Sequence, residues 1–263
     1  MTKHCIGILA IAWAMGLGSA QAKALRVCMT DVPHAPWRVP EDDGRVAGRG
    51  LDFDLLRDVE RVSGWTVVLQ VLSGRRCLVE VAAGRADATV GLSHTAERAQ
   101  SFRFPSRGDG LDTSLALRQD GYTLYRLRGS GVQWNGQRLR LKPEGAVLVQ
   151  SGHSVGSVLR ELGVPVTETE RSAFMVLSKL RLGEVEAAAV FTSEGQALRQ
   201  AHSQFEGLEP MSPALARKHY YVVFGEPFAR QHEADLPGLW RAFHQASKAP
   251  AYQAAVRRAK AAR

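Results

Sequence analysis

Cysteine is scarce in this 263-residue sequence: only Cys5, Cys28 and Cys77 occur, and their spacing matches no zinc or redox motif. Long apolar runs are missing as well, since no segment after residue 22 reaches the roughly 18 uninterrupted apolar residues of a membrane-spanning helix. Basic residues are scattered apart from Arg-Arg pairs and the tail RRAKAAR, which we expect to end a helix whose dipole its cations complement. We therefore expect no zinc site, no membrane span and no nucleic-acid partner.

The first 22 residues have the features of an export signal. Lys3 precedes the apolar run IGILAIAWAMGLG, and the AQA sequence at 20–22 supplies the small residues of a signal-peptidase site. We expect the mature chain to begin at Lys23 and to be soluble and periplasmic. Cys5 precedes the apolar run, so it is not placed to become a lipidated N-terminus. Cleavage also removes the charge of Lys3, which lowers the formal net charge by one, from +8 to +7.

Two cysteines remain in the mature chain, Cys28 and Cys77. An even count in an oxidising compartment favours one disulfide. It would close a loop of about 50 residues, which is worth roughly 4 kcal/mol in the chain-entropy model. The alternative is a pair of buried thiols.

The mature sequence alternates strand-like and helix-like segments twice, which is typical of an α/β fold with parallel sheets. The first series consists of a strand at 25–29, a helix at 51–64, a strand at 65–72, a helix at 77–84 and a strand at 86–92. The second consists of a strand at 145–150, a helix at 154–163, a strand at 164–168, a helix at 172–183 and a strand at 185–191. Two strand-like runs, at 112–120 and 218–227, stand where the chain can cross between two lobes, and two crossings imply a hinge and a cleft.

Ligands of open α/β sheets bind beyond the carboxyl ends of the strands. Three loops are predicted to meet there, at 30–37, 90–98 and 150–157. The second, VGLSHTAER, is expected to open a helix and to place Ser93 and Arg98 in the cleft, where a guanidinium can hold a carboxylate. The alternative is local: Thr95 caps the helix and Arg98 is a solvated charge in its first turn.

Four fragments in order resemble family 3 of the bacterial extracellular solute-binding proteins. They are GLDFDL at 50–55, AAGRADA at 82–88, SHTAER at 93–98 and LGEVEAAAV at 182–190. The resemblance implies a two-lobed periplasmic-binding-protein fold of type II, each lobe a mostly parallel sheet flanked by helices, with two hinge crossings. It also implies no cofactor, a membrane ABC permease as partner and a monomer. We expect a signal peptide at 1–22, a first lobe from 23–113 plus 219–263, and a second lobe from 114–218.

The same resemblance implies roles for particular residues. Arg98 corresponds to the arginine that grips the α-carboxylate of the ligand, and Ser93 to a serine that contacts carboxylate or ammonium. The first loop corresponds to one that supplies an acid and aromatic groups, here Asp31 and Trp37. Backbone N–H groups at the start of the second-lobe helix, from Gly152 through His153 to Ser154, are expected to add donors.

One position departs from the family pattern. Relatives that bind α-amino acids commonly carry an acid five residues past the aspartate that Glu186 replaces, and that position is Phe191. Either Glu194 or Asp31 substitutes for the missing acid, or the ligand is not a standard α-amino acid, because an unpaired buried ammonium is costly. We expect Phe191 and Trp37 to stack a flat or apolar part of the ligand between them.

Three other interpretations use the same residues or the same fold. The histidines His34, His94 and His153, one in each cleft loop, suggest a metal site, but no acid or cysteine joins them at ligand spacing, so we expect no metal. A periplasmic dehydratase-like enzyme would use Glu194 or Asp31 as general acid. A sensor or accessory binding protein outside transport is the third alternative. The sequence favours a non-enzymatic protein that captures a small carboxylate or amino acid for uptake.

Overall fold

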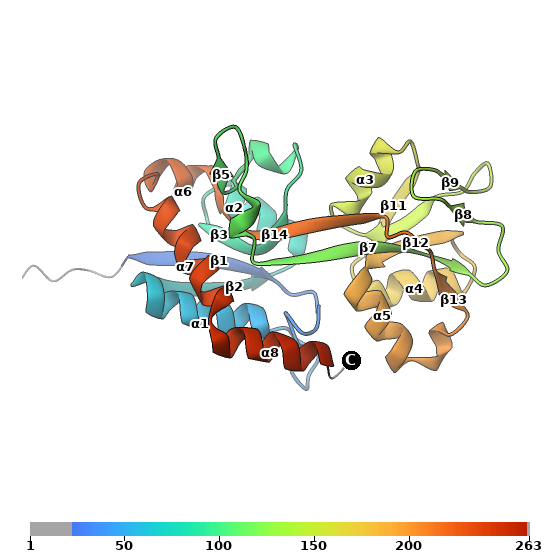
Figure 1. The fold of residues 1–263 in the computed structure, drawn as a ribbon, viewed down its shortest axis with the longest axis horizontal. Helices are drawn as coiled ribbons and strands as arrows, with labels where there is room; N and C mark the ends of the chain where they lie inside the picture. The colour runs from blue at the N-terminus through green and yellow to red at the C-terminus, as the bar shows by residue number, and fades with distance from the viewer. Residues whose placement is uncertain (1–22, 262–263) are drawn as a thin grey trace, which may run out of the picture.

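A single curved sheet connects the two halves of the molecule. The computed structural model describes residues 23–261, so the export signal predicted at 1–22 lies outside the described residues. The main strand order is β11-β10-β12-β7-β14-β3-β1-β2, with β13 added beside β7 and β4 beside β14. Figure 1 shows the elements gathered into two groups, which we call the first and second lobes, on either side of the long strands β7 and β14.

The first lobe contains the first predicted series of strands and helices. Strand β1 pairs in parallel with β2 on one side and β3 on the other. The helices α1 and α2 follow β1 and β2, and three helices at the end of the chain complete the lobe. The bounds are β1 Ala24–Thr30, α1 Leu51–Ser63, β2 Thr66–Leu72, α2 Gly74–Ala82, β3 Ala88–Ser93, α6 Glu226–Gln231, α7 Leu236–Lys248 and α8 Pro250–Ala261.

The second lobe repeats this arrangement around β10, which pairs in parallel with β11 and β12. Ser172 caps α4, because its side chain accepts a hydrogen bond from the backbone N–H of Met175. The bounds are β10 Val147–Gln150, α3 Val155–Glu161, β11 Val166–Glu170, α4 Ala173–Arg181, β12 Ala187–Phe191, α5 Thr192–Ala201 and β13 Leu208–Pro210.

Two long antiparallel strands cross between the lobes, β7 (Arg118–Leu127) and β14 (Ala216–Gly225). One end of β7 pairs with β12 in the second lobe, and its other end pairs with β14. Strand β14 continues into the first lobe beside β3. The run predicted at 218–227 lies mostly in β14, but only residues 118–120 of the run predicted at 112–120 belong to β7, because 113–115 form the 3-10 turn η2. Both crossing strands belong to one sheet.

The remaining elements are short. They are η1 Arg98–Gln100, β4 Phe102–Arg103, β5 Ser106–Arg107, β6 Gly110–Leu111, η2 Thr113–Leu115, β8 Gln133–Trp134, β9 Leu139–Arg140 and η3 Ser203–Phe205. The expected helix after β3 is wrong: only the 3-10 turn η1 follows it, so no helix N-terminus points into the cleft from that loop. The 30–37 loop does not open a helix directly either, because α1 begins at Leu51.

The loop that precedes α1 folds back onto the start of the helix. The backbone N–H groups of Leu51 and Asp52 donate to the carbonyls of Pro36 and Trp37, both at 3.0 Å. Gly50 makes this approach possible, since a Cβ there would stand 2.5 Å from the Trp37 carbonyl oxygen. As a result, the backbone of residues 36 and 37 caps α1, and the Trp37 side chain turns into the core of the first lobe.

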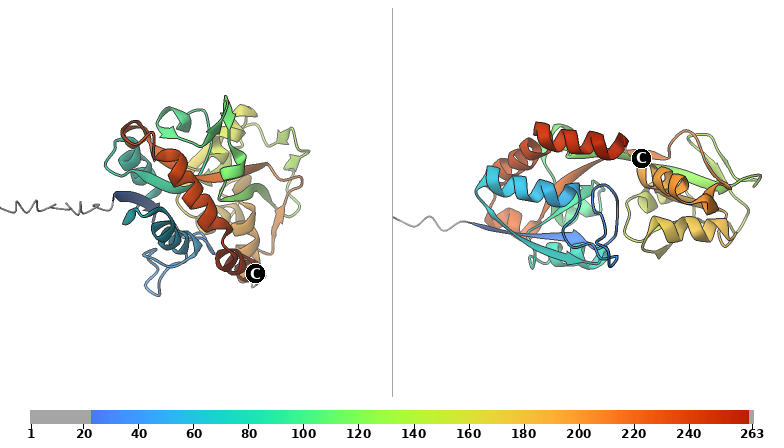
Figure 2. Two further views of the ribbon diagram at one scale, coloured as in Figure 1. Left: turned by 60° about the vertical axis from the view of Figure 1, so that its left-hand side comes forward. Right: turned by 90° about the horizontal axis from the view of Figure 1, so that it is seen from below.

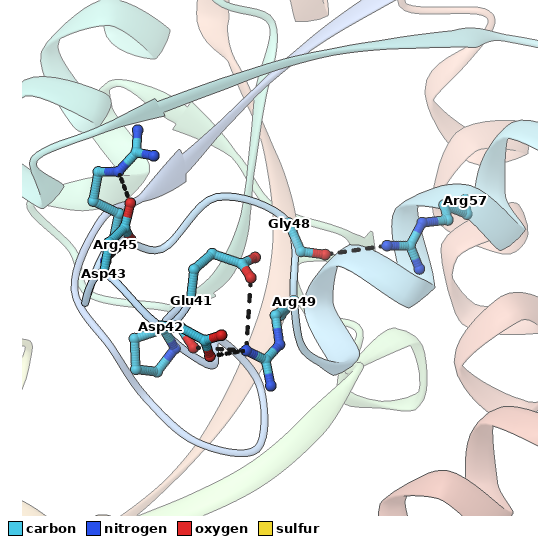
Figure 3. Close-up of polar contacts among 8 residues, drawn as sticks. Glu41, Asp42, Asp43, Arg45, Gly48, Arg49 and Arg57 are labelled. Atoms are coloured by element: carbon cyan, nitrogen blue, oxygen red, sulfur yellow. Dashed lines mark hydrogen bonds and ion pairs between the residues drawn. The ribbon is translucent and has the colours of Figure 1, made fainter.

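An acidic run in this loop is neutralised locally. Arg49 lies 3.6 Å from Glu41 and 3.4 Å from Asp42, and Arg45 lies 2.6 Å from Asp43 (Figure 3). The Arg57 side chain in α1 donates to the carbonyl of Gly48 at 3.1 Å. The acids therefore pair within the loop, and Arg57 joins the loop to α1.

The first lobe is completed by the end of the chain. Helices α7 and α8 pack beside α1, as Figure 2 shows. Phe243 of α7 is fully buried in the same apolar cluster as Leu25 of β1 and Leu55 of α1. Within residues 23–261, no helix combines the length and apolarity needed to cross a membrane.

The predicted disulfide between Cys28 and Cys77 is confirmed. Cys28 lies in β1 and Cys77 in α2, with Cα atoms 5.6 Å apart and a sequence separation of 49. Both residues are buried beside Val81 and Tyr221. The bond therefore ties the first helix turn after β2 to the central strand of the lobe.

We expect reduction of this disulfide to lower the free energy of unfolding by roughly 4 kcal/mol, because the unfolded chain regains the entropy of a loop of about 50 residues. Urea denaturation of the mature chain with and without reductant measures the change. The double variant Cys28→Ala/Cys77→Ala is the control and should not respond to reductant. An unchanged midpoint for fully reduced wild type would contradict the expectation.

Candidate functional site

A cavity of about 350 Å³ lies between the lobes, a volume typical of small-molecule sites. The three predicted loops line it through Thr30, Val32 and His34, through residues 90–93 with Arg98, and through residues 151–154. Helix α2 and the crossing strands supply much of the rest of the wall, and β3, β12 and neighbouring loops supply the remainder. Its further lining residues are Arg38, Ser73, Gly74, Arg75, Cys77, Leu78, Thr89, Arg118, Asp120, Tyr122, Arg171, Phe191 and Tyr220.

Arg98 turns its side chain inward from the loop after β3. One terminal nitrogen donates to the Ser93 carbonyl at 2.8 Å and to its hydroxyl at 3.0 Å. The other donates to the carbonyl of Gly152 in the second lobe at 2.8 Å. Thr95 does accept from the backbone N–H of Arg98, as the local alternative proposed, but the guanidinium is not a solvated charge. Burial lowers the pKa of Arg98.

Further contacts hold the lobes against each other around the cavity. The hydroxyls of Ser93 and Ser154 are 2.7 Å apart, and both side chains are buried. Arg171 of the second lobe forms an ion pair with Asp31 at 2.8 Å. Asp31 thus sits between the lobes, but it is not among the residues that line the cavity.

Phe191 lies in the cavity wall as predicted, but both faces of its ring are already covered. His34 stacks on one face with ring centroids 4.5 Å apart, and Tyr122 stacks on it at 4.6 Å. The expected pair of Phe191 with Trp37 is wrong, because the indole is only 7% exposed and belongs to the first-lobe core. The partner of Phe191 across the lobes is therefore His34.

Trp37 acts on the cavity indirectly, through Arg118. The guanidinium carbon of Arg118 lies 4.2 Å from the centroid of the indole ring, a cation–π contact. Gly91 opens the other side, since a Cβ at that position would stand 2.5 Å from an Arg118 nitrogen. The Arg118 side chain is thus packed between β3 and the loop before α1.

Two arginines that line the cavity, Arg38 and Arg118, form ion pairs with one buried carboxylate, that of Asp52. Asp52 in the first turn of α1 is fully buried; it accepts from Arg38 at 3.0 Å and from both terminal nitrogens of Arg118. Burial lowers the pKa of Arg38. Burial is the largest influence on the pKa of Arg118 and acts to lower it, but the charge of Asp52 and its hydrogen bonds, with smaller contributions from two tyrosines, together raise that pKa.

Two other predicted residues lie outside the cavity lining. His94 is exposed and packs edge-on against Phe104, with ring centroids 5.0 Å apart. Glu194 lies in the first turn of α5, where its charge opposes in part the lowering of the Arg38 pKa by burial. Neither side chain lines the cavity, so Glu194 does not stand in its wall in place of the acid that Phe191 replaces.

Three polar aromatic residues line the cavity near Arg98: His153, Tyr122 and Tyr220. Burial, reinforced by the charges of Arg98 and Arg38, lowers the pKa of His153 to about 3, so the imidazole is neutral at pH 7. Burial raises the pKa of Tyr122 to about 12 and that of Tyr220 further. These phenols are therefore neutral hydrogen-bonding groups.

The run GHSVG at 152–156 matches the Gly-x-Ser-x-Gly pattern of hydrolase nucleophiles and likewise joins a strand to a helix. Its backbone does not form the strained turn of such sites, because Ser154 has φ −66° and ψ −8°. The Ser154 hydroxyl bonds Ser93, and no described base contacts it. Among the described residues, no three His, Cys, Asp or Glu side chains are grouped to hold a metal.

Several lining residues were missed by the sequence reasoning. They are Arg38, Arg75, Arg118, Asp120, Tyr122, Arg171 and Tyr220. Four of them lie on the crossing strands, at Arg118, Asp120, Tyr122 and Tyr220. The runs at 112–120 and 218–227 were recognised as crossings, and their polar residues were the available signal.

The two-lobed fold with two crossing strands is that of type II periplasmic binding proteins, and solved structures of that class match most of the chain. An ancestral arginine-binding protein bound to glutamine is 16% identical over 91% of this chain and 98% of that chain, with a TM-score of 0.69. A histidine kinase sensor domain similar to periplasmic binding proteins is 19% identical over 90% and 96%, with a TM-score of 0.68. ArtJ, an arginine-, lysine- and histidine-binding protein of Geobacillus stearothermophilus, is 16% identical over 90% and 95%, with a TM-score of 0.67.

The sequence itself identifies the family. Residues 25–256 match the bacterial extracellular solute-binding proteins, family 3, and the chain belongs to that family. Comparison with curated protein sequences finds no match. The low identities to solved structures show the shared fold alone.

We expect Asp52→Asn to lower the free energy of unfolding by about 3–5 kcal/mol, because it leaves Arg38 and Arg118 buried without a carboxylate. Urea denaturation measures the loss. Asp54→Asn is the matched control: Asp54 lies two residues away in α1, is half exposed and pairs with Arg57, so it should cost less than about 1 kcal/mol. Equal losses for the two variants would contradict this account.

We expect His153 to make the protein less stable in acid. As pH falls below 6.5, the ordinary pKa of histidine, the imidazole of His153 binds a proton in the unfolded chain. In the native state the same imidazole stays unprotonated until about pH 3. Stability is therefore lost on acidification, and this group alone contributes about 2 kcal/mol between pH 7 and pH 5. Urea denaturation at both pH values should show a smaller loss in His153→Gln than in wild type. Equal losses would contradict the neutral imidazole.

Proposed function

We propose that this protein captures a small carboxylate-bearing ligand in the cavity between its lobes and delivers it to a membrane ABC permease. The proposal treats residues 23–113 with 219–263 and residues 114–218 as two lobes that close around the ligand as a monomer in the periplasm. Membership of the solute-binding family supports a binding role. A periplasmic location accords with that family and with the export signal predicted at 1–22.

The observation that carries the proposal is the position of Arg98. Its guanidinium lines the cavity, contacts both lobes and, among the described residues, has no carboxylate partner. Arg98 is half-buried. A partly desolvated cation without a counter-charge is unfavourable, so an anionic ligand would stabilise the closed arrangement. The hydroxyl of Ser93, bonded to Arg98, offers a second donor at the same place.

A sensor role is the second candidate. It is favoured by the similarity of 90% of this chain to a histidine kinase sensor domain, with a TM-score of 0.68. In that case a sensor protein in the membrane, and not a permease, would bind the form of the protein in which the lobes have closed around the ligand. The dehydratase alternative has less support, because the acids it required, Glu194 and Asp31, do not line the cavity.

We expect Arg98→Ala to abolish detectable binding of carboxylates while the protein remains folded. The loss of a charge-assisted, bidentate contact should remove roughly 2–5 kcal/mol of affinity. A thermal-shift screen of carboxylates and amino acids identifies a ligand for the wild type, and calorimetry then measures both proteins.

Arg61→Ala is the matched control, since Arg61 is an exposed arginine of α1 outside the cavity. Its affinity should equal that of wild type. Near-unchanged affinity in Arg98→Ala would remove the central support of the proposed function.

A further inference from the structure

Most of the arginines in the cavity wall are balanced without a ligand. Two of them share the buried carboxylate of Asp52, and a third forms an ion pair with Asp31 across the lobes. A fourth is exposed, so water screens its charge. In that order they are Arg38 and Arg118, Arg171, and Arg75. The wall also contains Arg98 and the carboxylate of Asp120, and within residues 23–261 neither of these two forms an ion pair.

Strand β7 directs the Asp120 side chain into the cavity. Side chains two residues apart on a strand lie on the same face, and Arg118, Asp120 and Tyr122 all line the cavity. The register places Tyr122 directly opposite Phe191 of β12. Asp120 is therefore a diagonal neighbour of the position where relatives commonly keep an acid. The negative charge that Phe191 lacks is present on the neighbouring strand.

The Asp120 carboxylate is held by two hydrogen bonds, and neither of them neutralises it. One oxygen accepts from the backbone N–H of Gly121 at 2.7 Å, and the other accepts from the Ser193 hydroxyl at 2.6 Å. An ionised carboxylate has about four acceptor positions, so each oxygen can accept one more hydrogen bond. Lys218 stands opposite Asp120 in the pairing of β7 with β14, but among the described residues no ion pair joins them. The carboxylate therefore retains its charge for a cation in the cavity.

Arg98 and Asp120 act on the same part of the cavity. Burial raises the pKa of Tyr122 to about 12; among the smaller influences, the charge of Arg98 lowers this pKa and that of Asp120 raises it. Burial also raises the pKa of Tyr220, and the charge of Asp120 adds to the increase. Both phenols line the cavity. A cation and an anion that face the same space suit a ligand that carries both charges.

We propose that Asp120 binds the ammonium group of a zwitterionic ligand, while Arg98 and Ser93 hold its carboxylate. This inference rests on the proposed function and names a residue that determines its specificity. The acid comes from a crossing strand, and not from the end of β12 where Phe191 stands. A simple carboxylate would leave the Asp120 charge facing the ligand without a counter-charge, and such a group disfavours binding.

Calorimetry with the mature chain, residues 23–263, tests the proposal with pairs of ligands that differ only in the ammonium group. The pairs are glutamine with 4-carbamoylbutanoate, phenylalanine with 3-phenylpropanoate, and 4-aminobutanoate with butanoate. In the pair that binds most tightly, we expect the amino compound to bind at least tenfold more tightly than its deaminated partner. Equal affinities would overturn the inference and leave the proposed function standing. A protein that binds no carboxylate at all would overturn both.

Asp120→Asn separates the charge of this residue from its structural role, because the amide keeps the shape and one acceptor oxygen. We expect it to weaken binding of the amino compound at least tenfold and to leave binding of the deaminated partner no weaker. Asp109→Asn is the matched control and should change neither affinity, since Asp109 is exposed and lies outside the cavity lining.

Two results with Asp120→Asn would overturn the inference. Equal losses for the two ligands would show that Asp120 only supports the wall, and an unchanged ratio of the two affinities would show that its charge does not contact the ammonium. The comparison of the two ligands with wild-type protein decides whether the cavity binds an ammonium even if Asp120→Asn fails to fold. In that event Asp120→Ser, which also removes the charge, is measured with the same pair and should again weaken only the amino compound.

Discussion

The ion pairs of Asp52 hold together the parts of the molecule that form the cavity. This fully buried carboxylate lies in α1, but its partners come from elsewhere: Arg38 from the loop after β1, and Arg118 from the start of β7. Buried charges are stable only when they are paired, so each of these elements is positioned by the others. Because both arginines line the cavity, the Asp52 carboxylate fixes their positions in its wall and offsets part of their positive charge.

Local signals in the sequence predicted most of the fold. Strand runs of apolar residues, the glycine that ends α1 with φ 71° and the serine cap of α4 all act within a few residues, and their elements appear as expected. The disulfide was also predictable, since only two cysteines remained in the mature chain. Element boundaries shifted where the local signal was weak. Helix α2 begins at Gly74, three residues before the expected start.

The wall of the cavity was less predictable because it depends on contacts between distant residues. The environment of Trp37 illustrates this: its backbone caps α1 through Asp52, and that contact pulls the indole into the core. Nothing local to the Pro-rich loop distinguishes this outcome from an indole in the cleft. The residues of the crossing strands join the wall only because β14 pairs with both β7 and β3. Arg98 and Ser93 were accessible to sequence reasoning because strand, turn and side chain all fall within six residues.

The order of the elements along the chain also sets the order in which the lobes can fold. The core of the first lobe joins Leu25 and Leu55 near the beginning of the chain to Phe243 and Tyr252 near its end. The second lobe lies between them in sequence and contains its own apolar clusters. During synthesis, therefore, the second lobe can collapse first, while β1 and α1 keep an uncovered apolar surface until α7 and α8 emerge. Contacts of such long sequence separation form slowly, so the core of the first lobe is completed last.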